Sequence, residues 1–153
     1  YEIRLSLVGS EMCIRDSILI ASLFILSCDE DVKSSTQHRW YTQSQVALGA
    51  ALFSTNCAAC HGDEAEGSAG DWKQRLDDGS FPPPPLNGSA HAWHHPISML
   101  LQVINEGGAS FGGMMPGFSD TLEDDDKLSV IAYFQSYWTD EVYYRWELMG
   151  GTD

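Results

Sequence analysis

The pentapeptide C-A-A-C-H at positions 57–61 constrains this chain more than any other stretch. Two thiols three residues apart, followed at once by a histidine, form the C-x-x-C-H pattern of covalent haem attachment. Each thiol can form a thioether with one vinyl side of the same porphyrin, and the histidine is then held under the iron. The pattern therefore predicts one c-type haem, attached through Cys57 and Cys60, with His61 as the proximal ligand.

Two other interpretations of paired cysteines fit the sequence less well. A thioredoxin-like C-x-x-C accompanies a βαβ pattern, which is not visible in this chain. A zinc ribbon needs a second C-x-x-C or a histidine pair at zinc-ligand spacing, and neither occurs. His91, His94 and His95 form a cluster, but no cysteine or carboxylate lies at a zinc-like spacing from them. We expect neither a second metal site nor a distal haem ligand among these histidines.

The first 27 residues stay outside the fold argument. Residues 1–17 resemble a translated sequencing adapter, and a genuine, unusual N-terminus is the alternative. The apolar run at 18–27 is far shorter than the ~20 residues of a membrane-spanning helix, and it predicts a truncated secretory signal peptide. The run leads into Leu-Ser-Cys, which resembles a bacterial lipobox with Cys28 as the lipidated residue. Cleavage near Ser27, as in an ordinary signal peptide, is the alternative. Both interpretations predict export to the bacterial periplasm.

The charge of the chain restricts its partners. The sequence has 8 Lys and Arg against 22 Asp and Glu, and residues 1–27 hold two of the basic and three of the acidic residues. From Cys28 onward the net charge is therefore −13. Such a surface repels nucleic acid and anionic lipid headgroups, so a lipid on Cys28 is the only membrane attachment that we expect. It steers the protein toward redox partners with a basic docking patch, unless it serves solubility alone.

The helical pattern begins after a polar tether at residues 28–39 and predicts one domain over residues 40–149. Thr42 and Gln45 form a capping box, which predicts a helix over 43–56 that runs straight into the cysteine motif. A glycine inside a helix costs about 1 kcal/mol relative to alanine. We therefore expect another helix to approach closely at Gly49, although a tolerated stray glycine is the alternative.

Three further helices follow from the spacing of apolar residues. The first covers 97–106 and ends at Gly107. The second begins in an acidic stretch with Thr121 as its cap and runs to about Trp138. The third covers 140–148 and has no assigned role.

Two loops carry further candidate site residues. Residues 81–88 include four consecutive prolines, which exclude a helix. This strip is either a stiff polyproline spacer or a support whose proline carbonyl accepts the Nδ1–H of His61. A glycine-rich loop later delivers Met114 and Met115, and a thioether is a soft ligand suited to haem iron opposite histidine. We expect Met115, held before Pro116, as the axial ligand, with Met114 as the alternative and core filling as the competing role for methionine.

The ordered set of C-x-x-C-H, Pro-Leu-Asn-Gly and Met-Pro resembles the class I monohaem cytochromes c over roughly residues 43–138. The resemblance implies an all-α fold whose helices wrap one covalently attached haem, joined by Gly- and Pro-rich loops. It implies His61 and Met115 as axial ligands and Pro84 as the carbonyl that binds His61. It also implies that the first helix crosses the C-terminal one near Tyr133.

The expected function is electron transfer through a single haem c, with no catalytic residues and no enzymatic activity of the chain itself. A haem enzyme or a gas-binding module with an open distal site is the alternative. A cytochrome subunit of a larger oxidase or dehydrogenase complex is a further one. Because the helices alone bury little apolar area, we also expect the haem-free chain to be largely unfolded.

Overall fold

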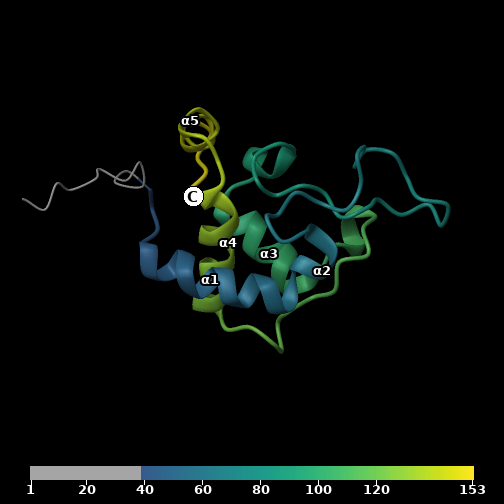
Figure 1. Cartoon of the computed structure of the whole chain (residues 1–153), viewed down its shortest axis with the longest axis horizontal. Helices are drawn as coiled ribbons and strands as arrows, with labels where there is room; N and C mark the ends of the chain where they lie inside the picture. The colour runs from purple at the N-terminus through teal and green to yellow at the C-terminus, as the bar shows by residue number, and fades with distance from the viewer. Residues whose placement is uncertain (1–38) are drawn as a thin grey trace, which may run out of the picture. The chain divides into compact units, whose positions relative to one another are not determined.

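The computed structural model describes residues 39–153. The predictions for residues 1–38, including the lipid site at Cys28, lie outside the described residues. The described part contains the helices α1 (Gln43–Asn56), α2 (Ala58–His61), α3 (Ile97–Glu106), α4 (Asp124–Ser136) and α5 (Asp140–Leu148), with two 3-10 turns, η2 (His91–His94) and η3 (Ala109–Phe111) (Figure 1). Within it no strand forms, and Phe81 and Gly113 make an isolated bridge. The predicted all-α fold is confirmed.

Helix α1 has the predicted bounds and the predicted cap. The hydroxyl oxygen of Thr42 accepts the Gln45 N–H at 3.2 Å, and the Gln45 side chain accepts the Thr42 N–H at 2.9 Å. These reciprocal bonds satisfy two backbone donors that the first turn leaves without helical partners. The helix runs directly to Cys57, whose N–H still bonds to the Phe53 carbonyl at 2.8 Å.

Helix α1 crosses α4 at the glycine that the sequence singled out (Figure 1). A Cβ atom added to Gly49 would collide with the Ser129 carbonyl of α4 and lie 2.9 Å from the Tyr133 Cβ. One helical turn further on, the Phe53 ring packs against the Tyr133 ring with centroids 5.0 Å apart. The expected close approach at Gly49 is therefore confirmed, and it sets the position of the haem motif relative to α4.

Helices α3 and α5 also have their predicted bounds, whereas α4 differs at its start and ends at Ser136, two residues before the predicted end at Trp138. The expected cap at Thr121 is wrong, because the Thr121 N–H bonds to the Phe118 carbonyl in a turn before the helix. Glu123 is the N-cap instead, in a capping box where the Asp126 carboxylate accepts the Glu123 N–H at 3.4 Å. Three aspartates in the first turn add favourable charge at the positive end of the helix dipole.

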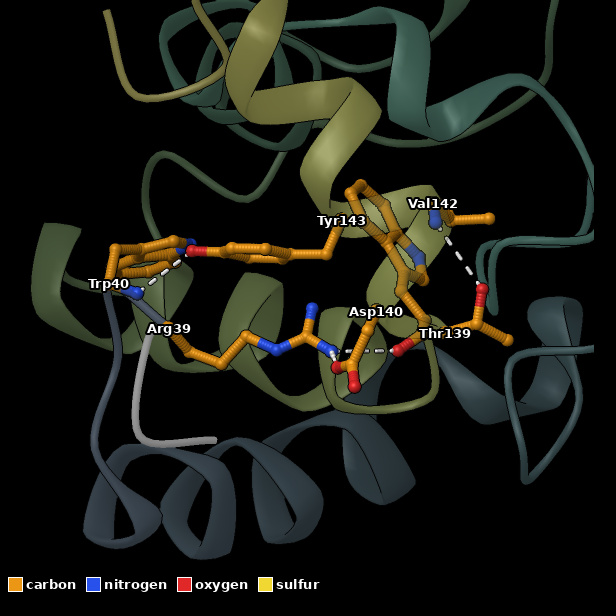
Figure 2. A network of polar contacts seen from close by, with 7 residues as sticks. Arg39, Trp40, Thr139, Asp140, Val142 and Tyr143 are labelled. Carbon is orange, nitrogen blue, oxygen red and sulfur yellow. Dashed lines mark hydrogen bonds and ion pairs between the residues drawn. The ribbon is translucent and has the colours of Figure 1, made fainter. Parts of the chain in front are cut away.

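Helix α5 packs against the domain through Tyr143 and Trp146, which are both buried. Figure 2 shows how the start of the domain is fastened to this corner. Arg39 was expected in the tether, but its guanidinium donates to the Trp138 carbonyl at 3.1 Å and pairs with Asp140 at 2.7 Å. The Tyr143 hydroxyl accepts the Trp40 N–H at 2.9 Å. The C-terminal helix thus holds the first residues of the described chain against the core.

Candidate haem site

The two cysteines lie on the single turn that follows α1. The Cys57 carbonyl accepts the N–H groups of Cys60 at 3.1 Å and His61 at 2.9 Å, so the motif is held as a helical turn. Cys57 is half-buried, Cys60 is exposed, and both thiols are free. Burial, with a smaller contribution from Cys60, raises the pKa of the Cys57 thiol to about 11. The raised pKa favours the protonated form of the Cys57 thiol at neutral pH.

The imidazole of His61 is buried and bonded on one side only. Its Nδ1 lies 2.9 Å from the Pro84 carbonyl oxygen, the contact expected from the resemblance. Because a carbonyl only accepts, Nδ1 carries the proton and Nε2 keeps its lone pair. No hydrogen bond to Nε2 is found from any residue within 39–153. Burial lowers the pKa of His61, against a raising effect of the Pro84 carbonyl, so the ring is neutral and able to bind a metal.

The proline strip is held beside His61 by the loop that follows the motif. The Ala65 carbonyl accepts two N–H groups, from Leu86 at 2.7 Å and from Asn87 at 3.1 Å. Ala65 is fully buried and has a φ of 57°, a left-handed conformation that is uncommon outside glycine. Gly67 allows the two segments to meet, since a Cβ atom there would lie 2.7 Å from the Pro85 nitrogen.

The role of Ala65 was not predicted from the sequence. An alanine in a glycine-rich loop has no local pattern that signals either a positive φ or a double acceptor. The signal that was available, the glycines at 62 and 67, marks only the turns around it.

The two candidate methionine ligands differ in burial. Met114 is 76 % exposed, whereas Met115 is partly buried and packs against the hydrophobic core. The Met115 carbonyl accepts the Gly108 N–H at 2.9 Å, and a Cβ atom at Gly107 would lie only 2.6 Å from that carbonyl. The glycines after α3 therefore let the loop fold back onto the helix end.

The residues present fit a covalently attached haem c. The donors are a neutral imidazole nitrogen without a protein partner, a partly buried thioether and two free thiols, as a His/Met-ligated c-type haem requires. Partly buried apolar side chains that pack against the core suit the surroundings of a porphyrin. They are Ala58, Leu86, Trp93, Ile97, Leu101 and Phe118.

The histidine cluster has other partners. The His91 ring stacks on Trp72 with centroids 4.4 Å apart, and the His94 ring stacks on Trp93 at 3.7 Å. In the part of the chain that the structure describes, no three His, Cys, Asp or Glu residues are grouped so that they could hold a metal ion.

A helical domain built around this site belongs to the class of c-type cytochromes. Residues 44–134 match the family described as cytochrome C oxidase, cbb3-type, subunit III. The match covers more than half of the chain, so the chain is a member of this family. Trp138 and the nine residues of α5 lie beyond the matched segment.

Two curated relatives and one solved structure are similar to the chain. The cbb3-type cytochrome c oxidase subunit FixP of Sinorhizobium medicae (strain WSM419) is 32% identical over 100 residues, which are 61% of this chain and 30% of the relative. The cbb3-type cytochrome c oxidase subunit CcoP of Azospirillum sp. (strain B510) is 30% identical over 89 residues, which are 58% of this chain and 27% of the relative. The chain thus spans under a third of the length of these relatives. The match to the crystal structure of cytochrome CL from Methylophaga aminisulfidivorans MPT covers 63% of this chain and 55% of the cytochrome CL chain. The two chains are 24% identical over the match, and the TM-score is 0.46.

Among residues 39–153 none of the helices has the length and apolar character needed to cross a membrane.

Proposed function

We propose that the chain is an electron carrier that holds one haem c through Cys57 and Cys60, with His61 and Met115 as axial ligands. The observation that carries this proposal is the orientation of His61, whose Nδ1 bonds to Pro84 while Nε2 has no partner within residues 39–153. A bound haem c supplies the one-electron couple of its iron. The protein contributes ligands, burial and the Pro84 hydrogen bond, and it needs no catalytic side chain.

We further propose that the carrier works at the bacterial periplasmic face, anchored by lipid on Cys28. The relatives are named as subunits of cbb3-type cytochrome c oxidases, which supports a place in or beside an oxidase complex. In that setting the chain delivers electrons and the catalytic reduction belongs to another subunit. The net charge of −13 from Cys28 onward favours a basic docking surface on the partner protein.

The haem-enzyme alternative requires an open iron, and one experiment separates it from the carrier. Visible spectra of the holoprotein are recorded in the oxidised and reduced states, and carbon monoxide is added to the reduced form. A carrier shows a far-red methionine–iron band when oxidised and no response to carbon monoxide. A high-spin spectrum that shifts with carbon monoxide contradicts the proposal.

Matched alanine variants identify the sulfur ligand. Met115→Ala is expected to abolish the far-red band and to open the reduced protein to carbon monoxide. Met114→Ala removes a side chain that is 76 % exposed, so the spectrum should remain that of the wild type and stability should change by less than about 0.5 kcal/mol. The reverse result would make Met114 the ligand.

A further inference from the structure

The side chain of Trp138 reaches the strip that holds His61. It is 2 % exposed and lies just after α4, beyond the family-matched residues 44–134. Its indole Nε1–H donates to the Leu86 carbonyl at 2.7 Å. Leu86 stands two residues after Pro84, whose carbonyl bonds to His61.

Apart from Leu86, the strip is attached by backbone hydrogen bonds, from the Ser68 N–H to the Pro83 carbonyl at 3.2 Å and from the Asn87 N–H to the Ala65 carbonyl at 3.1 Å. At its start, the Phe81 N–H bonds to the Gly112 carbonyl at 3.3 Å. Four of its residues are prolines, which have no N–H to donate. The Leu86 N–H is bonded to the Ala65 carbonyl at 2.7 Å, and the Leu86 carbonyl is bonded to Trp138. Leu86 is therefore fixed at both ends, once by the loop after the haem motif and once by the indole.

Gly88 makes room for this contact. It has a φ of +92°, and a Cβ atom there would lie 3.0 Å from the Trp138 Cδ1. The absence of a side chain at the glycine of the Pro-Leu-Asn-Gly sequence therefore lets the Trp138 ring pack against the strip.

Two aromatic rings pack against the Trp138 indole. The Trp146 ring of α5 meets it edge-on at 5.9 Å, and the Phe134 ring of α4 lies at 6.2 Å. The Trp138 carbonyl accepts the Arg39 guanidinium at 3.1 Å, at the corner drawn in Figure 2. Contacts from α4, α5 and the first described residue thus restrict both the side chain and the backbone of Trp138.

We propose that Trp138, supported by α5, is a positioning residue for the proximal histidine. It holds the Leu86 carbonyl and thereby keeps the Pro84 carbonyl oxygen in place against the His61 Nδ1–H. This inference rests on the proposed function, because it takes His61 as the proximal ligand. It gives the helix beyond the matched domain a role: support of the strip that sets the basicity of the ligand.

The chain offers a matched control. Trp146 is 1 % exposed and donates its indole N–H to the His95 carbonyl at 2.9 Å, so Trp138→Phe and Trp146→Phe each remove one buried indole donor from a backbone carbonyl. The Trp146 acceptor, His95, does not belong to the proline strip. Phenylalanine at position 146 keeps an aromatic ring beside Trp138, so this variant removes the donor and retains the support from α5. A purely structural role predicts similar behaviour of the two variants at His61.

The holoproteins of the wild type and both variants are compared in the reduced, diamagnetic state. Covalent haem is first verified by mass. Trp138→Phe is expected to exchange the His61 Nδ1 proton at least tenfold faster than Trp146→Phe. It should also raise the reduction potential, since a less basic imidazole stabilises the oxidised iron less. Equal exchange rates and equal potentials in the two variants overturn the inference.

Hydrogen exchange in the wild-type holoprotein tests the same inference without any variant, and it therefore applies even if Trp138→Phe does not fold. The Trp138 indole N–H and the His61 Nδ1–H should exchange through the same local opening, with equal opening free energies. Different opening free energies overturn the inference. If the wild type carries no covalent haem, the proposed function fails instead, and the two failures are thereby distinguished.

Discussion

At the scale of single residues, the corner between the first described residues and α5 contains buried polar atoms without partners. Within residues 39–153 these include Arg39 Nη1, the Tyr41 hydroxyl and Gln135 Nε2. A buried polar group without a hydrogen bond costs about 1–3 kcal/mol of stability. Tyr41 is the simplest of the three to test, because phenylalanine keeps its ring contacts with Trp40 and Tyr143.

We expect Tyr41→Phe to stabilise the holoprotein by about 1 kcal/mol at neutral pH, because it removes the unpaired hydroxyl. Burial raises the pKa of Tyr41 from 10.0 to about 12, so the folded protein holds this proton more tightly than the unfolded chain. The wild-type protein therefore keeps its full stability below pH 10.0 with respect to this group and loses stability as the pH rises toward about 12, because the unfolded chain ionises first. Denaturant unfolding across this range should therefore show a shallower alkaline loss in the variant.

The control for this prediction is Tyr144→Phe, which removes a hydroxyl from a side chain that is 60% exposed. Its stability should lie within about 0.5 kcal/mol of the wild type. A Tyr41→Phe protein that is less stable than the wild type at pH 7 would show that the hydroxyl has a stabilising partner.

At the scale of elements, the crossing of α1 and α4 fixes where the haem motif begins. The two helices meet where Gly49 faces the Ser129 carbonyl, and a backbone atom cannot rotate away from an added side chain. The glycine therefore costs α1 some intrinsic helicity and allows the contact between the helices.

We expect Gly49→Ala to destabilise the protein by about 2 kcal/mol or more. Overpacking costs about 1–3 kcal/mol, and we expect the upper end of this range because the added methyl group meets backbone atoms. This cost exceeds the gain of about 1 kcal/mol in helix propensity. Guanidinium unfolding of the holoprotein measures the difference. The matched variant Ser54→Ala adds no atoms at an exposed position of α1 and should change stability by less than about 0.5 kcal/mol. A stabilised Gly49→Ala protein would mean that the helices can move apart at little cost.

At the scale of the whole molecule, the two dominant features are the excess of acidic residues and the haem expected within the core. The chain has 22 acidic and 8 basic residues, so its field attracts cations over about a Debye length, ~8 Å at physiological ionic strength. The core is assembled from helices joined by long glycine- and proline-containing loops, and partly buried apolar side chains pack against it.

The charge predicts opposite salt effects for opposite redox reagents. Electron exchange of the holoprotein with a small cationic metal complex should slow as ionic strength rises, and exchange with an anionic complex should accelerate. Stopped-flow rates over a salt series measure both, with a neutral complex as the control. Rates that are independent of salt for all three reagents would show that the acidic surface does not act at the site of electron exchange.

The expected haem predicts that the chain without it is largely unfolded. Cys57→Ala combined with Cys60→Ala removes both attachment points, and the resulting haem-free protein should give a poorly dispersed NMR spectrum. The reason is that a small domain with long loops buries too little apolar area without the porphyrin. A well-dispersed spectrum of the haem-free chain would contradict this prediction.

The sequence by itself determined the features that depend on residues close together in the chain. The C-x-x-C-H motif predicts haem attachment within five residues, and the capping box at Thr42 specifies the start of α1. The bounds of α3 and α5 follow from apolar spacing and terminal residues in the same way. The glycine at position 49 even indicated a helix contact, because an unfavourable residue inside a helix needs a compensating reason.

Only the tertiary structure decided the features that depend on what lies nearby in space. The burial of Met115 rather than Met114, the left-handed Ala65 and the reach of Trp138 to Leu86 each arise from segments that meet after folding. The start of α4 belongs here too, because the turn closed by the Phe118 carbonyl, and not the nearest hydroxyl, determines which residue caps the helix. Local propensities differ by about 1 kcal/mol or less among ordinary residues, so packing and hydrogen bonds between distant segments override them.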